Sequence, residues 1–226
     1  MIDFQPFSKI ARLSREVVVT EKIDGTNAQI LIVPASECSV TDDLMAVSLG
    51  DKLVPGSLNV YAGSRNRLLC VNSDNFGFAR WVEENADELR KLGPGRHFGE
   101  WWGKGIQRGY GQTQKRFSLF NVHRWMPENP GNPFSAVIEL KKESDEYGAQ
   151  MVPTGNRIEC CHVVPTIWRG NFDTGEINDF IEMLRIEGSF AAPGFPRPEG
   201  IVIYHTASGQ LFKKTLIDDE KPKSQV

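Results

Sequence analysis

The clearest chemical potential in the sequence lies in the run Glu21-Lys22-Ile23-Asp24-Gly25-Thr26-Asn27. This run places the amine of Lys22 between the carboxylates of Glu21 and Asp24, next to a glycine suited to a turn. A lysine amine attacks phosphorus only when it is neutral, and a free lysine has a pKa of roughly 10.4. Burial or nearby cations favour the neutral amine. The run therefore predicts covalent nucleotide transfer through Lys22, and it predicts basic residues elsewhere in the same pocket.

The alternative is an ordinary surface lysine in a hairpin, because Lys-x-Asp-Gly alone is short enough to occur by chance. The flanking residues favour strands in either case. Residues 17–19 are all valine, and residues 28–33 form a second run rich in apolar side chains. β-Branched residues of this kind are enriched in strands. We expect Lys22 on a strand or in the short turn between two strands.

The rest of the chain predicts more strands than helices. Strand-like runs cover residues 58–62, 97–103, 117–122, 158–167, 201–205 and 211–215. Helical spacing of apolar residues predicts helices over 78–92 and 179–187, which end at glycines. Residues 34–58 and 126–136 have the composition of turn-rich loops, and the charged segment 141–150 is either helical or exposed. Sequential strands favour an α+β fold with antiparallel sheets and flanking helices.

The composition fits one globular domain. At 226 residues, with 40% hydrophobic and 24% charged residues, the chain can bury a substantial core. No apolar run approaches the roughly 20 residues that a membrane span needs, and residues 1–6 lack the features of a secretory signal. We therefore expect a cytoplasmic protein. Its four cysteines include no Cys-x-x-Cys pair, which argues against a zinc knuckle or a redox pair.

A basic stretch interrupts a chain that is acidic overall. The net charge is −3, yet between residues 90 and 124 Glu100 is the only acidic residue. The densest cations after Glu100 are Lys104, Arg108, Lys115 and Arg116, and they are interspersed with Trp101, Trp102, Tyr110 and several glycines. Cations neutralise phosphates, and aromatic rings stack on bases. The four cations are therefore candidate nucleic-acid contacts, and solvated surface charge is the alternative.

Six short motifs follow one another along the chain: Lys22-x-Asp24-Gly25, Ser64-Arg65, Phe98-Gly99-Glu100, Phe117-x-x-Phe120, Glu199-Gly200-x-Val202 and Phe212-Lys213-Lys214. In this order they resemble the covalent nucleotidyltransferase superfamily of polynucleotide ligases and capping enzymes. The closest likeness is to the ATP-dependent RNA ligase family typified by the second RNA ligase of a T-even phage, because Glu-Lys-Ile-x-Gly-Thr-Asn is characteristic of that branch. The resemblance covers residues 17–215 and implies the nucleotidyltransferase fold of ligase catalytic domains.

The resemblance implies a role for each motif. Lys22 would attack the α-phosphate of ATP and hold AMP as a phosphoramidate, with release of pyrophosphate. Glu199 would help to hold Mg²⁺ or Mn²⁺, with Asp24 as a further oxygen donor. Lys213 or Lys214 would lie on the α-phosphate and neutralise charge in the transition state. The other implied nucleotide contacts are Arg65 with the ribose or a phosphate, Glu100 with the ribose hydroxyls, Phe120 stacked on adenine with Phe117 as its substitute, and Glu21 and Asn27.

Three departures from the phage-type pattern leave the substrate class open. Asp24 stands where the phage-type RNA ligase has a histidine. DNA ligases and many other RNA ligases have an aspartate at this position. Asn121 replaces an aspartate, and the usual Lys-x-Lys is here the adjacent pair Lys213-Lys214, of which one should face away. The leading interpretation is an RNA ligase that joins a 5′-phosphate to a 3′-hydroxyl. A minimal DNA ligase, or a nucleotide- or RNA-end-binding module without catalysis, are the alternatives.

Only residues 216–226 follow the last motif. DNA ligases and capping enzymes carry an OB domain at that point, and the phage RNA ligase carries a small helical domain. We therefore expect residues 1–226 to form a single adenylyltransferase domain without a C-terminal OB or helical domain. The nucleic acid would be held by the domain's own surface, with residues 101–116 as the main candidate, or by an accessory protein.

Overall fold

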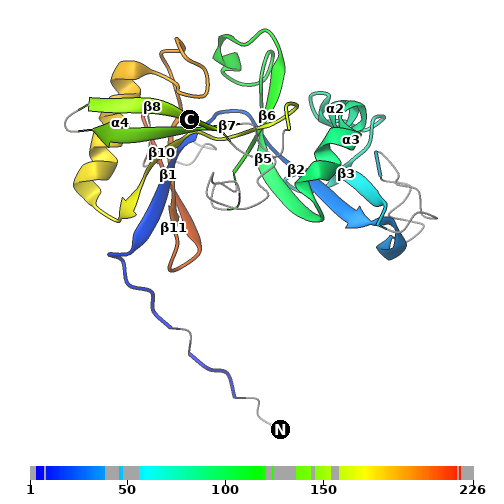
Figure 1. Ribbon diagram of the computed structural model, residues 1–226, viewed down its shortest axis with the longest axis horizontal. Helices are drawn as coiled ribbons and strands as arrows, with labels where there is room; N and C mark the ends of the chain where they lie inside the picture. Colours follow the sequence, from blue (N-terminus) through cyan, green and yellow to red (C-terminus); the bar gives the residue numbers. More distant parts are fainter. Residues whose placement is uncertain are drawn as a thin grey trace.

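The computed structural model contains two six-stranded sheets, and the chain passes between them more than once (Figure 1). It describes residues 4–7, 9–38, 46–47, 56–120, 124, 158–217 and 219, and the backbone of residues 136–143 and 146–153. Sheet A has the strand order β12-β11-β1-β10-β7-β8, and sheet B has the order β4-β3-β2-β5-β6-β9. Most neighbouring strands are antiparallel, which confirms the predicted α+β class.

Sheet A is built around β1, which pairs with β10 on one side and β11 on the other. Its strands are β1 (Glu16–Lys22), β7 (Ala136–Glu143), β8 (Glu146–Pro153), β10 (Thr166–Asn171), β11 (Gly200–His205) and β12 (Gln210–Thr215). Val17 and Val19 pack with Phe180 and Leu184 of α4 (Thr174–Glu187) in one core. Val18 belongs to a different cluster, because successive side chains of a strand face opposite sides. One face of β1 is therefore covered by α4.

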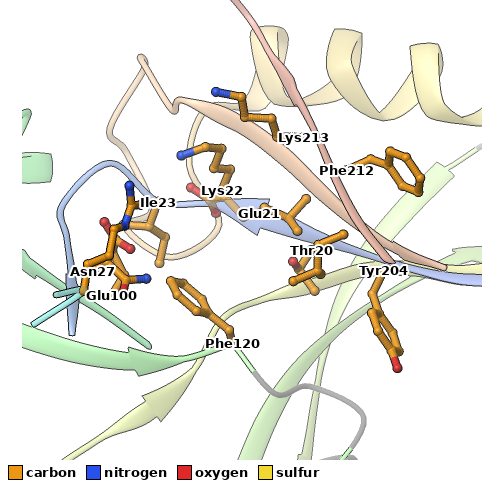
Figure 2. Close-up of a pocket in the computed structure, with 13 residues that line it drawn as sticks. Thr20, Glu21, Lys22, Ile23, Asn27, Glu100, Phe120, Tyr204, Phe212 and Lys213 are labelled. Atoms are coloured by element: carbon orange, nitrogen blue, oxygen red, sulfur yellow. The ribbon is translucent and has the colours of Figure 1, made fainter. Parts of the chain in front are cut away.

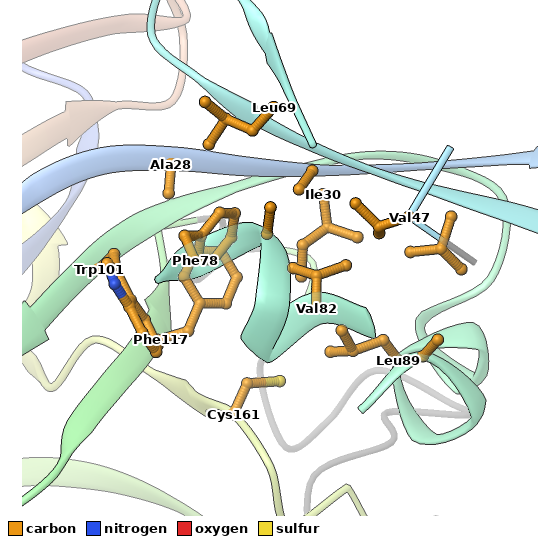
Figure 3. Close-up of a cluster of buried hydrophobic side chains, with 14 of the residues drawn as sticks. Ala28, Ile30, Val47, Leu69, Phe78, Val82, Leu89, Trp101, Phe117 and Cys161 are labelled. Atoms are coloured by element: carbon orange, nitrogen blue, oxygen red, sulfur yellow. The ribbon is translucent and has the colours of Figure 1, made fainter. Parts of the chain in front are cut away.

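Sheet B packs against two short helices (Figure 3). Its strands are β2 (Thr26–Pro34), β3 (Leu58–Ser64), β4 (Leu68–Leu69), β5 (Gly95–Gly103), β6 (Lys115–Leu119) and β9 (His162–Val163). The helical segments are η1 (Ala35–Glu37), α2 (Phe78–Glu84), α3 (Ala86–Leu89), η2 (Arg90–Leu92) and η3 (Gly109–Gly111). Phe78 and Val82 of α2 lie against Ala28 and Ile30 of β2 in the core of this half.

The chain passes from sheet A to sheet B at the motif that contains Lys22. Lys22 is the last residue of β1, and β2 begins at Thr26 in the other sheet. A small apolar cluster joins the two sheets here, with Val18 from β1 and Trp102 from β5. The prediction that Lys22 lies on a strand is confirmed, whereas a hairpin around it is wrong because the two strands do not pair with each other.

Several predicted elements differ from the observed ones. In the segment 141–150, expected to be helical or exposed, residues 141–143 and 146–150 belong to the antiparallel pair β7 and β8, so the helical alternative is wrong. The single helix expected over 78–92 is broken, because Asn85 has non-helical backbone angles. α4 begins at Thr174 rather than at residue 179, after the carboxylate of its cap residue Asp173 accepts two amide hydrogen bonds. Asn121 and most of the predicted loops 34–58 and 126–136 lie outside the described residues.

Within the described part of the chain, no helix has the length and apolar character needed to cross a membrane.

Candidate active site

Two adjoining cavities open where the two sheets meet. The first has a volume of about 320 Å³, and the apolar residues of its lining include Phe120, Val202, Tyr204 and Leu211. Figure 2 shows Phe120 and Tyr204 in this cavity. The second has a volume of about 630 Å³ and a mostly polar lining that includes Ser64. Both cavities are lined by Lys22, Asn27, Arg65, Glu100 and Lys213. An apolar chamber that continues into a polar groove is suited to a nucleotide, with the base in the chamber and the phosphates in the groove.

Lys22 and Glu199 form an ion pair in this structure. Lys22 Nζ lies 2.6 Å from Glu199 Oε2, and the two side chains are 21% and 4% exposed. Lys22 lies opposite Gly200 in the pairing of β1 with β11, which brings Glu199 to the end of β1. The amine must lose a proton before it acts as a nucleophile, since a protonated nitrogen has no lone pair to attack phosphorus.

Glu100 reaches the same junction from β5. Its Oε1 accepts a hydrogen bond from the Gly25 amide at 3.0 Å, and the strand pairing aligns Glu100 with Asn27 of β2. Burial raises the pKa of Glu100 to about 7, although the charge of Lys22 and the hydrogen bond from Gly25 oppose this shift. Burial therefore favours the protonated form of Glu100 more than it would be favoured in an exposed glutamate. Glu100 can donate a hydrogen bond to a substrate hydroxyl or accept one from it.

The carboxylates near Lys22 fit a metal ion that arrives with a phosphate. Among the described residues, no three carboxylate, histidine or cysteine side chains converge as a preformed metal site. Glu199 and Glu100 are close enough for the charge of one to influence the other. Mg²⁺ commonly binds through one or two carboxylates, waters and substrate phosphates rather than through an all-protein cage. The donor set suits this mode, and the metal-binding role expected of Glu199 stays a prediction.

β12 presents Lys213, rather than Lys214, to the cavities. Lys213 pairs with Val202, which lines the first cavity, whereas Lys214 pairs with Ile201, which is buried in the core with α4. Figure 2 shows the amine nitrogens of Lys22 and Lys213 on the same side of the cavity. Because side chains alternate along a strand, the register identifies Lys213 as the lysine that can reach a phosphate beside Lys22.

Glu21, the neighbour of Lys22, uses its carboxylate elsewhere. The Ser189 hydroxyl donates to Glu21 Oε1 at 2.6 Å, and the Ala191 amide donates to Oε2 at 2.8 Å. Burial raises the pKa of Glu21 to about 7, against the lowering effect of these hydrogen bonds. Glu21 borders the first cavity, yet its carboxylate anchors the segment that follows α4. The nucleotide contact expected of Glu21 stays a prediction.

Of the two candidate stacking residues, Phe120 faces the first cavity. Phe120 is half-buried just after β6, where its amide donates to the Phe98 carbonyl at 2.9 Å. Phe117 is fully buried in the core of sheet B, with its ring centre 5.2 Å from that of Phe78. The substitute role expected of Phe117 is therefore wrong, because the pleat of β6 turns this ring toward α2.

Comparison with known proteins agrees with the arrangement of the motifs. The model of the RNA ligase family matches residues 15–215. The chain belongs to the RNA ligase family. Among solved structures, this RNA ligase homologue is similar to the apo form of a mutant RNA ligase from Naegleria gruberi, with 15% sequence identity and a TM-score of 0.48. The similarity covers 89% of this chain and 50% of that chain, and no curated protein matches.

The four cations expected to bind nucleic acid occupy different environments in this member of the RNA ligase family. Lys104 is exposed, Lys115 Nζ donates to the Phe76 carbonyl at 2.6 Å, and the Arg116 guanidinium lies 5.9 Å from the ring centre of Trp102. Arg108 is partly exposed, and its Nε donates to Asp24 Oδ2 at 3.0 Å. Neither Arg108 nor Asp24 is among the described residues that line the two cavities. RNA contacts from these cations stay predictions.

The aromatic residues of the same stretch are not available to stack on bases. Trp101, Trp102 and Tyr110 are 2%, 1% and 1% exposed. The indole nitrogen of Trp102 donates to the Ser118 hydroxyl at 2.9 Å, and the Tyr110 hydroxyl accepts the Asp24 amide hydrogen bond at 2.8 Å. The stretch 101–116 is therefore not the mixed aromatic and basic surface that the sequence predicted.

Three residues of the first cavity were missed by sequence reasoning, although the strand pattern contained a signal for them. Thr20, Tyr204 and Leu211 line the first cavity. Each stands two residues from a motif residue on the same strand, namely Lys22, Val202 and Lys213. Residues two positions apart on a strand face the same side of the sheet. Including the residue two positions from each motif residue would therefore have found all three.

Proposed function

We propose that this chain is an ATP-dependent RNA ligase that works through a covalent lysyl-AMP intermediate on Lys22. The match to the RNA ligase family supports RNA ligation as the general activity. The observation that carries the finer proposal is the position of Lys22 at the junction of an apolar cavity and a polar one, with Lys213 beside it. The α-phosphate is the first phosphate after the nucleoside. An amine at the junction of base chamber and phosphate groove is suited to attack it.

In the first step Lys22 Nζ forms a bond to the α-phosphorus, and the bond from that phosphorus to the pyrophosphate oxygen breaks. Pyrophosphate leaves with the bonding electrons. Glu199, 2.6 Å from Nζ, can take the proton that the amine loses. Lys213 supplies positive charge to the α-phosphate while negative charge builds there, which stabilises the transition state more than the ground state.

Other residues of the two cavities hold and orient the nucleotide. Phe120 stacks on the adenine ring, and Glu100 bonds the ribose hydroxyls from its position beside Gly25. Arg65 and Asn27 line the polar groove, where they can bind phosphate or ribose oxygens. Glu199 and Glu100 would hold Mg²⁺ or Mn²⁺, which supplies positive charge to the phosphates when bound.

In the later steps AMP passes from Lys22 to the 5′-phosphate of an RNA end. The 3′-hydroxyl of a second end then attacks that phosphorus, a phosphodiester forms, and AMP leaves. The activity suits RNA repair in the cytoplasm. Lys104, Lys115 and Arg116 are proposed contacts to the RNA backbone, alone or together with an accessory protein.

The proposal is tested with α-labelled ATP, Mg²⁺ and matched nicked duplexes of RNA or DNA. It predicts acid-labile label on the protein, transfer of the label to the 5′-phosphate of RNA, and sealed RNA. Sealing of DNA alone would identify a minimal DNA ligase instead. Label from GTP and not from ATP contradicts the proposal. Binding of ATP or RNA ends without any covalent label would identify a binding module.

A further inference from the structure

Arg108 joins three segments that are far apart in the sequence. Its Nε donates to Asp24 Oδ2 at 3.0 Å, and its Nη1 donates to the carbonyls of Arg197 and Pro198, each at 2.9 Å. The side chains of Arg108 and Asp24 are 31% and 11% exposed. A guanidinium is planar and offers several donors in a fixed fork, so one such side chain can hold several acceptors in a set geometry. The bonds from Arg108 therefore fix Asp24 relative to the segment 197–198.

The segments that Arg108 joins carry the two members of the ion pair in the proposed active site. Asp24 stands two residues after Lys22, and Pro198 stands directly before Glu199. The contact of 2.6 Å between Lys22 and Glu199 joins the end of β1 to the segment before β11. Arg108 joins the same two segments a second time, through Asp24 and the Pro198 carbonyl. A displacement of either segment would move the amine relative to the carboxylate and to the phosphate groove.

The loop that carries Arg108 is held in place by buried contacts of its own. The Tyr110 ring is 1% exposed, with its centre 4.6 Å from that of Phe195 and 5.3 Å from that of Trp102. Its hydroxyl accepts the Asp24 amide at 2.8 Å. Burial raises the pKa of this hydroxyl, which therefore keeps its proton at neutral pH.

The backbone of the same loop adopts a conformation that few residues tolerate. Gln107 and Tyr110 have φ values of 45° and 51°, in the left-handed region that side chains other than glycine rarely adopt. Such a conformation persists only where surrounding contacts determine it. The buried contacts of Tyr110 therefore hold the loop in the conformation in which Arg108 bonds to Asp24 and to residues 197–198.

We propose that Arg108 is a positioning residue for self-adenylation. It holds the Asp24 segment and the segment before Glu199 so that Lys22, Glu199 and the α-phosphate are aligned. The inference rests on the proposed function and deepens it. Since Arg108 is not among the described residues that line either cavity, its loss should slow the attack by Lys22 and leave ATP binding almost unchanged.

The test measures single-turnover formation of the AMP adduct against ATP concentration in wild type and Arg108→Ala. A misplacement of about 1 Å can cost roughly 100-fold in rate, and we expect a fall of that order in the maximal rate. The ATP concentration at half-maximal rate should stay within about threefold of the wild-type value, because the contacts that bind ATP are retained. Added guanidinium should restore part of the rate in Arg108→Ala. Arg80→Ala removes an exposed arginine of α2 that is not among the described residues lining either cavity, so it is the matched control and should behave as wild type.

Two further variants extend the test. Arg108→Lys keeps the positive charge and much of the aliphatic part of the side chain. It replaces Arg108→Ala in the measurement if Arg108→Ala does not fold. A lysine ammonium lacks the planar fork, and its adduct formation should still be at least about tenfold slow. The variant Asp24→Asn combined with Arg108→Ala should be no slower than the slower single variant, because residues that act as a unit are non-additive.

Several results would overturn the inference. Adduct formation at the wild-type rate in both Arg108 variants would overturn it. If the sealing of RNA alone falls in these variants, Arg108 is an RNA contact, as the sequence predicts. A raised half-saturating ATP concentration with an unchanged maximal rate makes Arg108 a nucleotide contact instead. If wild type itself forms no adduct with ATP, the proposed function fails and this inference fails with it.

Discussion

The two faces of β1 give neighbouring residues opposite tasks. On the face toward the cavities, Thr20 and Lys22 border the proposed nucleotide site. On the face toward α4, Val17 and Val19 pack in a buried core and Glu21 anchors the segment after the helix. The difference shows how a lysine with 21% side-chain exposure is held in place. Buried contacts on the face toward α4 fix the strand, so Lys22, the proposed nucleophile, is held in place although it is partly exposed.

The same comparison applies to β12, where Lys213 faces the cavities and Lys214 does not. Lys213→Ala should slow adduct formation roughly 100-fold, the loss typical when one group that stabilises transition-state charge is removed. Lys214→Ala should change the rate by no more than about twofold, as for a residue away from the site. The matched pair is measured by single-turnover adenylation. Equal partial losses from both variants would show that the faces of β12 are not distinct in this step.

A smaller effect is expected at the apolar residues of the first cavity. Phe120→Ala removes the proposed stacking surface, and base stacking contributes about 1–3 kcal/mol. The half-saturating ATP concentration should therefore rise roughly tenfold, with a smaller change in maximal rate. Phe98→Ala is the control, because Phe98 is 46% exposed and is not among the described residues lining either cavity. If both variants bind ATP like wild type, Phe120 is a structural residue.

The smallest effect on activity is expected on the face of β1 toward α4. The pKa of Glu21 rises from 4.5 to about 7 on folding, so the folded state binds more protons than the unfolded state between these values. Folding stability from this group is therefore greatest at low pH and is lost as the pH rises toward about 7. Glu21→Gln removes the titration. Its stability relative to wild type should increase by at most about 3 kcal/mol between about pH 4.5 and pH 8.

Thermal unfolding of both proteins across this pH range is the measurement for Glu21. The difference between the two curves isolates Glu21 from Glu100, whose pKa is also raised to about 7, and from His97, whose pKa is lowered to about 4. A constant difference at all pH values would show that Glu21 does not titrate in this window. A large rise in half-saturating ATP would instead place its side chain in the nucleotide site.

Local sequence patterns predicted the strand that ends at Lys22, because β-branched runs and alternation act over a few residues. They did not predict that β1 and β2 enter different sheets. That outcome depends on pairings between distant segments, such as Lys22 with Gly200 and Thr26 with Trp101. The choice between Lys213 and Lys214 has the same origin, since the register of β12 on β11 decides it.

The basic loop after β5 shows a second limit of sequence reasoning. Its glycines and cations have the composition of an exposed surface, and Lys104 and Gln107 are exposed, but Tyr110 is buried. Arg108 is partly exposed and has acceptors at Asp24 and at the segment before Glu199. An arginine that only meets solvent and one that bonds to distant segments look the same in sequence, so only the three-dimensional arrangement separates them.

The role of Lys22 as the nucleophile is tested most directly by the intact mass of the protein after incubation with ATP and Mg²⁺. Wild type should gain the mass of one AMP, located on the peptide that contains Lys22 and lost in acid. Lys22→Ala should gain none, and neither should Lys22→Arg, which keeps a positive charge beside Glu199 but has no nucleophilic amine. An AMP adduct that persists in these variants, or that maps to Lys213 in wild type, would contradict the assignment.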